Sequence, residues 1–131
     1  MRKKQHLQQT PQIRSIARRL LEAACLAEES GDRQEAIRLY LKSVRNGSSE
    51  AAVNLANIYT KGRRDSGRYL IAKRLYRMAY RQGCIYGATA LGLQYREEGK
   101  AKLAIMWLER AANMGEEWAS ETLHEMRKLA G

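Results

Sequence analysis

Small and apolar side chains recur along most of this chain at the spacing of one face of an α-helix. In residues 52–59 they stand at positions i, i+3, i+4 and i+7, and residues 88–95 repeat the same spacing. In residues 72–80 and 104–112, Leu, Tyr and Trp alternate with alanine at helical intervals. Because such alternation lets one helix approach another closely, we interpret the aromatic residues as core packing and not as a cofactor box or a base-stacking platform.

Helix start and stop signals divide this pattern into seven predicted helices. Thr10 before Pro11 is typical of a helix start, and Asp32 is a typical N-cap for the second helix. Glycine follows nearly every helix, because it adopts the positive φ of a helix C-terminus without steric cost. The expected helices cover residues 11–29, 33–46, 48–61, 68–82, 86–98, a sixth segment that follows Gly99 and ends at Gly115, and 116–129.

Three segments of the chain repeat one another. The strings AIRLYLKSVRNG, AKRLYRMAYRQG and AIMWLERAANMG begin at Ala36, Ala72 and Ala104, which are 36 and then 32 residues apart. A period of this length is typical of a helical solenoid, in which each unit buries its apolar face against its neighbours. We therefore predict an all-α fold, a right-handed α-solenoid of three helix hairpins (about 18–49, 50–85 and 86–117) and a C-terminal capping helix (118–131). Residues 11–131 would form a single domain behind a basic N-terminal arm, residues 1–10.

These segments resemble the Sel-one-like repeat, a branch of the tetratricopeptide superfamily with the approximate pattern A-x-x-x-L-G-x-x-Y-x-x-G, a loop, and A-x-x-W-Y-x-x-A-A-x-x-G-x-x-x-A. The resemblance runs from about Leu20 to the C-terminus. The middle loop has the family length but carries Arg64, Asp65 and Arg68 in place of a glycine-valine pair and an aspartate, and the first and third loops are short, as in ordinary tetratricopeptide repeats. The matching residues are Ala52, Leu55, Ala56, Tyr59, Gly62, Ala72, Leu75, Tyr76, Ala79, Gly83 and Gly87, then Ala88, Leu91, Gly92, Tyr95, Ala104, Trp107, Leu108, Ala111, Ala112, Gly115 and Ala119.

The resemblance implies which positions look into a concave groove, because in the family the first helix of each hairpin lines it. A mixed lining of this kind suits a peptide or a partner helix. Val53, Tyr86 and Ala90 stand where basic residues of a carboxylate clamp would be expected, so that activity is not predicted. Tyr86 and Trp118 could instead pack between repeats. The implied groove residues are Arg18, Leu21, Cys25, Glu28, Glu50, Val53, Asn57, Thr60, Tyr86, Thr89, Leu93, Arg96, and further along Trp118, Glu121 and Glu125.

Positive charge is concentrated in two parts of the chain. The net charge is +10, and residues 61–82 carry eight basic residues against Asp65 alone, while residues 1–19 carry six and no acidic residue. Such a stripe could contact an acidic protein, nucleic acid or anionic lipid, or could be a solvated face. We expect it on the convex side, opposite the face that Ala72, Tyr76 and Tyr80 share. Its members are Lys61, Arg63, Arg64, Arg68, Lys73, Arg74, Arg77 and Arg81.

Catalytic and metal-binding patterns are not found. His6 and His124 have no ligand partners at metal spacing, Cys25 and Cys84 are isolated, and there is no phosphate loop or nucleophile elbow. No apolar run is long enough to span a membrane, and the N-terminus lacks the apolar core of a signal peptide, so we expect a cytoplasmic protein. We therefore predict no enzyme, no cofactor and no metal.

Two functions remain open. The first is a small adaptor or scaffold that binds a protein or peptide partner, an acidic one included, in the concave groove. The second is a basic helical module that binds nucleic acid through the stripe at 61–82, and it is the less favoured because the repeats build a groove while the arginines are confined to one repeat. Salt dependence separates them, because phosphate binding weakens steeply with salt.

Overall fold

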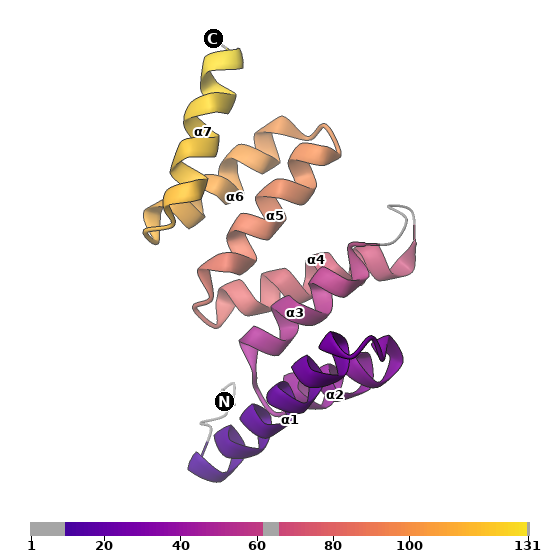
Figure 1. The fold of residues 1–131 in the computed structure, drawn as a ribbon. Helices are drawn as coiled ribbons and strands as arrows, with labels where there is room; N and C mark the ends of the chain where they lie inside the picture. Colours follow the sequence, from indigo (N-terminus) through magenta and orange to yellow (C-terminus); the bar gives the residue numbers. More distant parts are fainter. Residues whose placement is uncertain (1–9, 62–65, 131) are drawn as a thin grey trace, which may run out of the picture. The chain divides into compact units, whose positions relative to one another are not determined.

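The computed structural model describes residues 10–61 and 66–130, and within these ranges every regular element is an α-helix (Figure 1). This confirms the all-α prediction. Each predicted helix is found, and most bounds lie within one or two residues of those expected. The helices are α1 (Pro11–Glu29), α2 (Arg33–Arg45), α3 (Ser49–Tyr59), α4 (Gly67–Arg81), α5 (Ile85–Glu97), α6 (Ala101–Asn113) and α7 (Glu117–Ala130).

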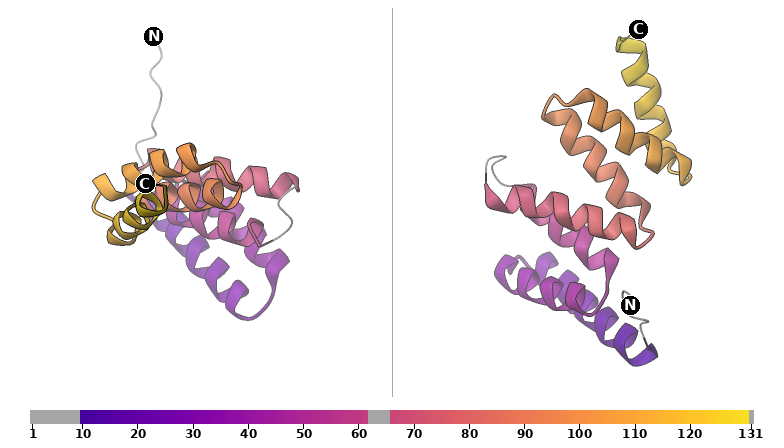
Figure 2. Two further views of the ribbon diagram at one scale, coloured as in Figure 1. Left: turned by 90° about the horizontal axis from the view of Figure 1, so that it is seen from above. Right: turned by 180° about the vertical axis from the view of Figure 1, so that it is seen from behind.

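The chain divides into two compact units, one up to Leu55 and one from Ala56 onward. In the first unit, α1 and α2 pack against each other as a hairpin (Figures 1 and 2). In the second, α4 packs on α5, α5 on α6, and α6 on α7. The last contact places α7 where the capping helix was expected. The single domain with repeat units at 18–49, 50–85 and 86–117 stays a prediction.

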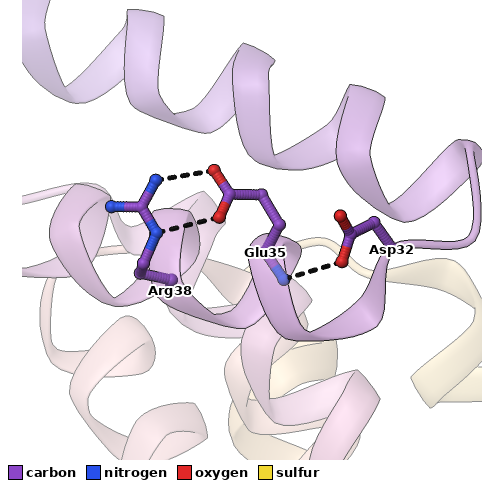
Figure 3. Close-up of polar contacts among 3 residues, drawn as sticks. All are labelled: Asp32, Glu35 and Arg38. Atoms are coloured by element: carbon purple, nitrogen blue, oxygen red, sulfur yellow. Dashed lines mark hydrogen bonds and ion pairs between the residues drawn. The ribbon is translucent and has the colours of Figure 1, made fainter.

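The expected caps begin the first two helices. The Thr10 hydroxyl accepts a hydrogen bond from the backbone N–H of Ile13 at 3.2 Å. The Asp32 carboxylate accepts from the N–H of Glu35 at 3.2 Å, and the Glu35 carboxylate in turn accepts two hydrogen bonds from Arg38 at 2.9 and 2.6 Å (Figure 3). The side-chain hydrogen bond from Arg38 lowers the pKa of Glu35. Each cap satisfies an N–H that a helix start leaves without an intrahelical partner.

The predicted glycine stops are confirmed at three equivalent helix ends. Gly47, Gly83 and Gly115 have φ of +98°, +95° and +96°. At the end of α4, the N–H of Cys84 donates to the carbonyl of Ala79 at 3.0 Å and the N–H of Gly83 to that of Tyr80 at 2.9 Å. This pair of bonds is a Schellman motif, which requires the left-handed residue. The stop expected for α3 at Gly62 lies outside the described residues.

The core alternates small and large side chains, as predicted. In the first unit, Ala17, Ala24, Ala36 and Tyr40 are buried, and the hydroxyl of buried Ser43 donates to the carbonyl of Ala17 at 2.7 Å. In the second unit, four of the five aromatic residues assigned to the core are at most 8% exposed, which confirms their packing role. These four are Tyr59, Tyr76, Tyr95 and Trp107. The fifth, Tyr80, is half-buried.

The joint between α5 and α6 is closely packed and fully buried at its centre. Leu91 and Leu108 are fully buried, which confirms their predicted place in the core. Gly92 lies directly against Leu108, because a Cβ added at Gly92 would stand 2.6 Å from the Leu108 Cγ. The Tyr80 and Trp107 rings meet edge to face beside this joint, with centroids 5.2 Å apart.

Candidate partner-binding surface

A cavity of about 280 Å³ lies in the second unit, between the end of α3, helix α4 and helix α5. Helix α5 supplies one wall with residues spaced three and four apart, which places them on one helical face. Helix α4 supplies two tyrosines. The lining residues are Asn57, Thr60, Tyr69, Tyr76, Ala90, Leu93, Gln94 and Glu97.

Part of the cavity wall is an internal hydrogen-bond chain. The Tyr76 hydroxyl donates to the Asn57 side-chain oxygen at 2.5 Å, and the Thr60 hydroxyl donates to the Asn57 carbonyl at 3.0 Å. Burial raises the pKa of the Tyr76 phenol, so the hydroxyl keeps its proton and remains a donor. The chain fixes the Asn57 amide at this wall.

Two lining residues have polar atoms without a partner in the described structure. The Tyr69 hydroxyl and both amide atoms of Gln94 are buried and accept or donate no hydrogen bond within the described residues. Tyr69 is 4% exposed and Gln94 is 5% exposed. Neither residue was predicted from the sequence to be part of a site. A signal was present for Gln94, because it stands three residues after the core residue Leu91 and seven after Gly87, on the packed face of its helix.

Three of the predicted groove residues, Asn57, Thr60 and Leu93, line this cavity together. Tyr86 stands on the same face of α5 as Ala90 and Leu93, at i, i+4 and i+7, and it is 62% exposed. This exposure leaves little support for Tyr86 as a packing residue between repeats. Trp118 is also exposed, at 42%.

Two further groove residues of α5 lie in different surroundings. Arg96 is exposed. Thr89 is buried, and its hydroxyl lies 2.7 Å from the Glu116 carboxylate. The same carboxylate accepts the N–H of Trp118 at 3.0 Å at the start of α7. Thr89 therefore joins α5 to the turn before α7 instead of presenting an open side chain.

Four of the predicted groove residues of the first unit also come together, namely Arg18, Leu21, Cys25 and Glu50, whereas Glu28 and Val53 are not among the residues that line the cavity. A cavity of about 540 Å³ there brings together residues of α1 with the first turn of α3. Val53 is half-buried. The free thiol of Cys25 lies 3.5 Å from the Tyr40 hydroxyl, which donates to Glu28 at 2.7 Å. The cavity is lined by Arg18, Leu21, Glu22, Cys25, Leu26 and Glu50.

The basic stripe does not form one exposed surface, contrary to the expectation from its spacing. Lys73 is held by the Glu98 carboxylate at 2.7 Å and lies over the Tyr95 ring, 4.7 Å from its centroid, and its side chain is 14% exposed. Arg77 donates to the Tyr95 hydroxyl at 3.4 Å. The reason is the docking of α4 on α5, which brings the start of the α5–α6 turn against this side of α4.

Burial alone would raise the pKa of the Glu98 carboxyl. The hydrogen bonds and charges of Lys73 and Lys100 outweigh burial and hold that pKa below its ordinary value. Lys73 is thus part of a structural ion pair.

The rest of the stripe is in three different situations. Lys61, Arg74 and Arg81 are exposed. Arg68 is exposed and stacks over the Tyr59 ring, 5.2 Å from the centroid. Arg63 and Arg64 lie outside the described residues. The exposed cations of α4 are therefore fewer than the spacing predicted.

Within residues 10–61 and 66–130, no group of three or more His, Cys, Asp or Glu side chains is placed to hold a metal ion. The helices of the same part of the chain include none that is both long and apolar enough to cross a bilayer.

The comparisons with known proteins rest on structure. No family model and no curated protein sequence matches the chain. The N-terminal domain of stress-induced protein-1 (STI-1) from C. elegans superposes with a TM-score of 0.73 at 13% identity, covering 90% of this chain and 99% of that domain. A Sel1 repeat protein from Oxalobacter formigenes superposes with a TM-score of 0.65 at 25% identity, covering 87% of this chain and 96% of that one.

Both neighbours are helical repeat structures, and repeat proteins of these two types generally mediate protein–protein interactions and are generally non-catalytic. The helix hairpins found here have the order expected of such repeats. The chain thus resembles the Sel1-like and tetratricopeptide-type helical repeat proteins, as its sequence motifs predicted.

Proposed function

We propose that this chain is a non-enzymatic protein-interaction module that binds a segment of a partner protein on the exposed face of α5. The proposal rests on one observation: an exposed aromatic residue and two cavity-lining residues share one face of α5. Tyr86, an exposed aromatic residue, precedes Ala90 and Leu93, which line the 280 Å³ cavity, by one and two helical turns. Exposed aromatic residues beside a recess are the usual anchors of protein interfaces.

The chemistry of this face suits a polypeptide. Tyr86 offers a rigid apolar ring with a polar tip, and Leu93 adds apolar area on the cavity wall. Arg96 and Glu97 carry opposite charges at the far end of the same helix. A mixed surface of this kind matches a peptide or an amphipathic helix, whose apolar side chains fill recesses while its polar groups meet the rim.

The nucleic-acid alternative has weaker support. Phosphate binding needs several exposed cations on one surface. Lys73 is engaged by Glu98 and Arg77 by Tyr95, so the stripe lacks its two central cations. Within the described residues, the exposed cations of the stripe are Lys61, Arg68, Arg74 and Arg81. A stripe without its central cations would give a shallower salt dependence than its spacing predicts.

A selection of random peptides displayed on phage against the full chain tests the proposal. Enriched peptides are synthesised, and their Kd is measured with the wild type, with Tyr86→Ala, and with Leu70→Ala as a matched control. Leu70 is 59% exposed on α4, so its loss removes a similar apolar side chain away from the α5 face. We expect Tyr86→Ala to weaken binding by about 2 kcal/mol, as for an interface hot spot, and Leu70→Ala to leave it unchanged.

Two results would contradict the proposal. One is a peptide that binds Tyr86→Ala as well as the wild type. The other is a single-stranded RNA oligonucleotide that binds more tightly than any enriched peptide at near-physiological salt and is lost in the double variant Arg74→Gln/Arg81→Gln. That pattern would assign the function to the basic residues of α4.

A further inference from the structure

The cavity beside α5 contains an unusual set of buried polar atoms. The Gln94 side chain is 95% buried and lines the cavity, and neither its NH₂ group nor its carbonyl oxygen has a partner within the described residues. Tyr69 lines the same cavity, and its hydroxyl is also buried without a partner within the described residues. Buried polar atoms in proteins are nearly always paired, so three unpaired atoms in one recess indicate that something else pairs with them.

The donor and acceptor types of these atoms restrict the chemistry of the group that can pair with them. Gln94 presents one donor group and one acceptor, and the Tyr69 hydroxyl can act as either. A carboxylate offers acceptors only and would leave the Gln94 oxygen unpaired. An ammonium or guanidinium group offers donors only and would leave the Gln94 NH₂ unpaired. An amide group offers both, and it therefore complements Gln94 with two hydrogen bonds.

The hydrogen-bonding capacity of the cavity wall is not spread evenly over its residues. Asn57 is already fixed by Tyr76, so the free hydrogen-bonding capacity of the wall is concentrated at Gln94 and Tyr69.

We propose that this cavity receives the side-chain carboxamide of an asparagine or glutamine of the bound partner segment; the inference rests on the proposed function. The volume of about 280 Å³ exceeds that of several water molecules at about 30 Å³ each, so a short polar side chain fits. Because Gln94 and Tyr69 are almost fully buried, a main chain that crosses the surface at Tyr86 stays too far out, whereas a side chain from it reaches inward.

The first test uses small probes on the full ¹⁵N-labelled chain, so it does not depend on any partner. Propionamide, propionate and propylammonium are titrated separately, and the side-chain NH₂ signals of Gln94 and Gln82 are followed by NMR. Gln82, exposed at the end of α4, is the control amide. We expect a saturable shift of the Gln94 signals with propionamide alone, and its loss in Tyr69→Phe, while the variant Gln82→Met leaves it unchanged.

Equal shifts at Gln94 and Gln82, or a larger response to propionate or propylammonium, would overturn the inference. No response to propionamide at Gln94 would also overturn it, because the buried atoms would then be satisfied by water alone.

The second test uses the enriched peptides. Each peptide with an asparagine or glutamine is compared with versions carrying aspartate or leucine at that position, on the wild type and on Gln94→Met. On the wild-type protein, we expect the changed peptide to bind at least tenfold more weakly than the parent peptide. On Gln94→Met, the parent and changed peptides should bind equally, because the peptide amide no longer has the Gln94 amide as its partner. Independent losses on both proteins would overturn the inference.

The failures of the two proposals are distinguishable. Peptides that depend on Tyr86 but respond to no amide replacement overturn the carboxamide assignment and leave the interaction module standing. A propionamide response at Gln94 without any peptide that depends on Tyr86 supports the amide site and contradicts the proposed function.

Discussion

Gly87 and Gly83 lie four residues apart, and the two positions require glycine for different reasons. Gly83 has φ of +95° with open space around its Cα, so a side chain there meets only backbone strain. Gly87 is packed against α4, and an added Cβ would contact the Tyr76 carbonyl and stand 2.8 Å from the Tyr80 nitrogen. Both atoms belong to the backbone of another helix, so the clash is relieved only if α4 and α5 separate.

We therefore expect Gly87→Ala to lower the free energy of unfolding by about 3 kcal/mol, at the upper end for overpacking. Gly83→Ala should lower it by about 1 kcal/mol, the usual difference for a left-handed helix end. Urea denaturation followed by circular dichroism measures both. Equal losses for the two variants would show that α4 and α5 do not approach as closely as the structure has them.

The unpaired atoms of Gln94 and Tyr69 predict an unusual response to mutation. Removing a buried polar group that lacks a partner relieves its desolvation penalty. We expect Gln94→Met and Tyr69→Phe to have unfolding free energies equal to the wild type or up to about 1 kcal/mol higher. A loss of about 2 kcal/mol or more in either variant would mean that the side chain is paired inside the folded chain.

The ion pair between Glu98 and Lys73 should make the free energy of unfolding depend on pH. Its pKa is lowered in the folded state from the ordinary value of 4.5, so its stabilisation is complete above that value and is lost as pH falls through the lower folded pKa. Glu98→Gln should cost about 1–2 kcal/mol at neutral pH, as for a charge-assisted hydrogen bond to Lys73, and the difference from wild type should shrink as the pH falls below 4.5 and through the lowered pKa of Glu98.

The control for Glu98 is Glu109→Gln, which breaks the exposed pair with Arg127. An exposed pair contributes little, so we expect a loss below about 0.5 kcal/mol at any pH. Urea denaturation at neutral and acidic pH gives both values. A loss in Glu98→Gln that is the same at both pH values would contradict the assigned ion pair.

At the scale of the helices, the sequence predicts much because the signals are local. Thr10, Pro11 and Gly31 stand next to the ends they set, and α1 begins and ends as expected. The fate of Lys73 could not be predicted, because its partner Glu98 follows 25 residues later and meets it only through the docking of α4 on α5. The same holds for the cavity, since Tyr69 and Gln94 come from different helices.

The α5–α6 joint supports a prediction about coupled residues. Leu108→Ala should cost about 2–5 kcal/mol, since it empties a fully buried site. Gly92→Ala should also destabilise, because its Cβ would stand 2.6 Å from the Leu108 Cγ. The double variant should lose less than the sum, because removing the leucine makes room for the added methyl group. Additive losses in urea denaturation would contradict the direct contact, and Leu103→Ala, at a half-exposed position of α6, is the control.

At the scale of the whole molecule, the proposed function resides in a surface and not in a reaction. The period of 32 to 36 residues predicts helix hairpins, and the superposition on repeat proteins agrees with that fold. The proximity of the groove residues could be predicted in part, because Asn57, Thr60 and Leu93 do line one cavity. The chemistry of that cavity could not, because it depends on two side chains that the motif does not distinguish.

The most direct test of this assignment is where a bound segment lies on the chain. An enriched peptide is added to the ¹⁵N-labelled full chain, and the backbone amide shifts are mapped by NMR. We expect the largest changes on the α5 face from Tyr86 to Glu97 and at Asn57 and Thr60. Changes centred on Arg74 and Arg81 of α4, with the α5 face unaffected, would contradict it.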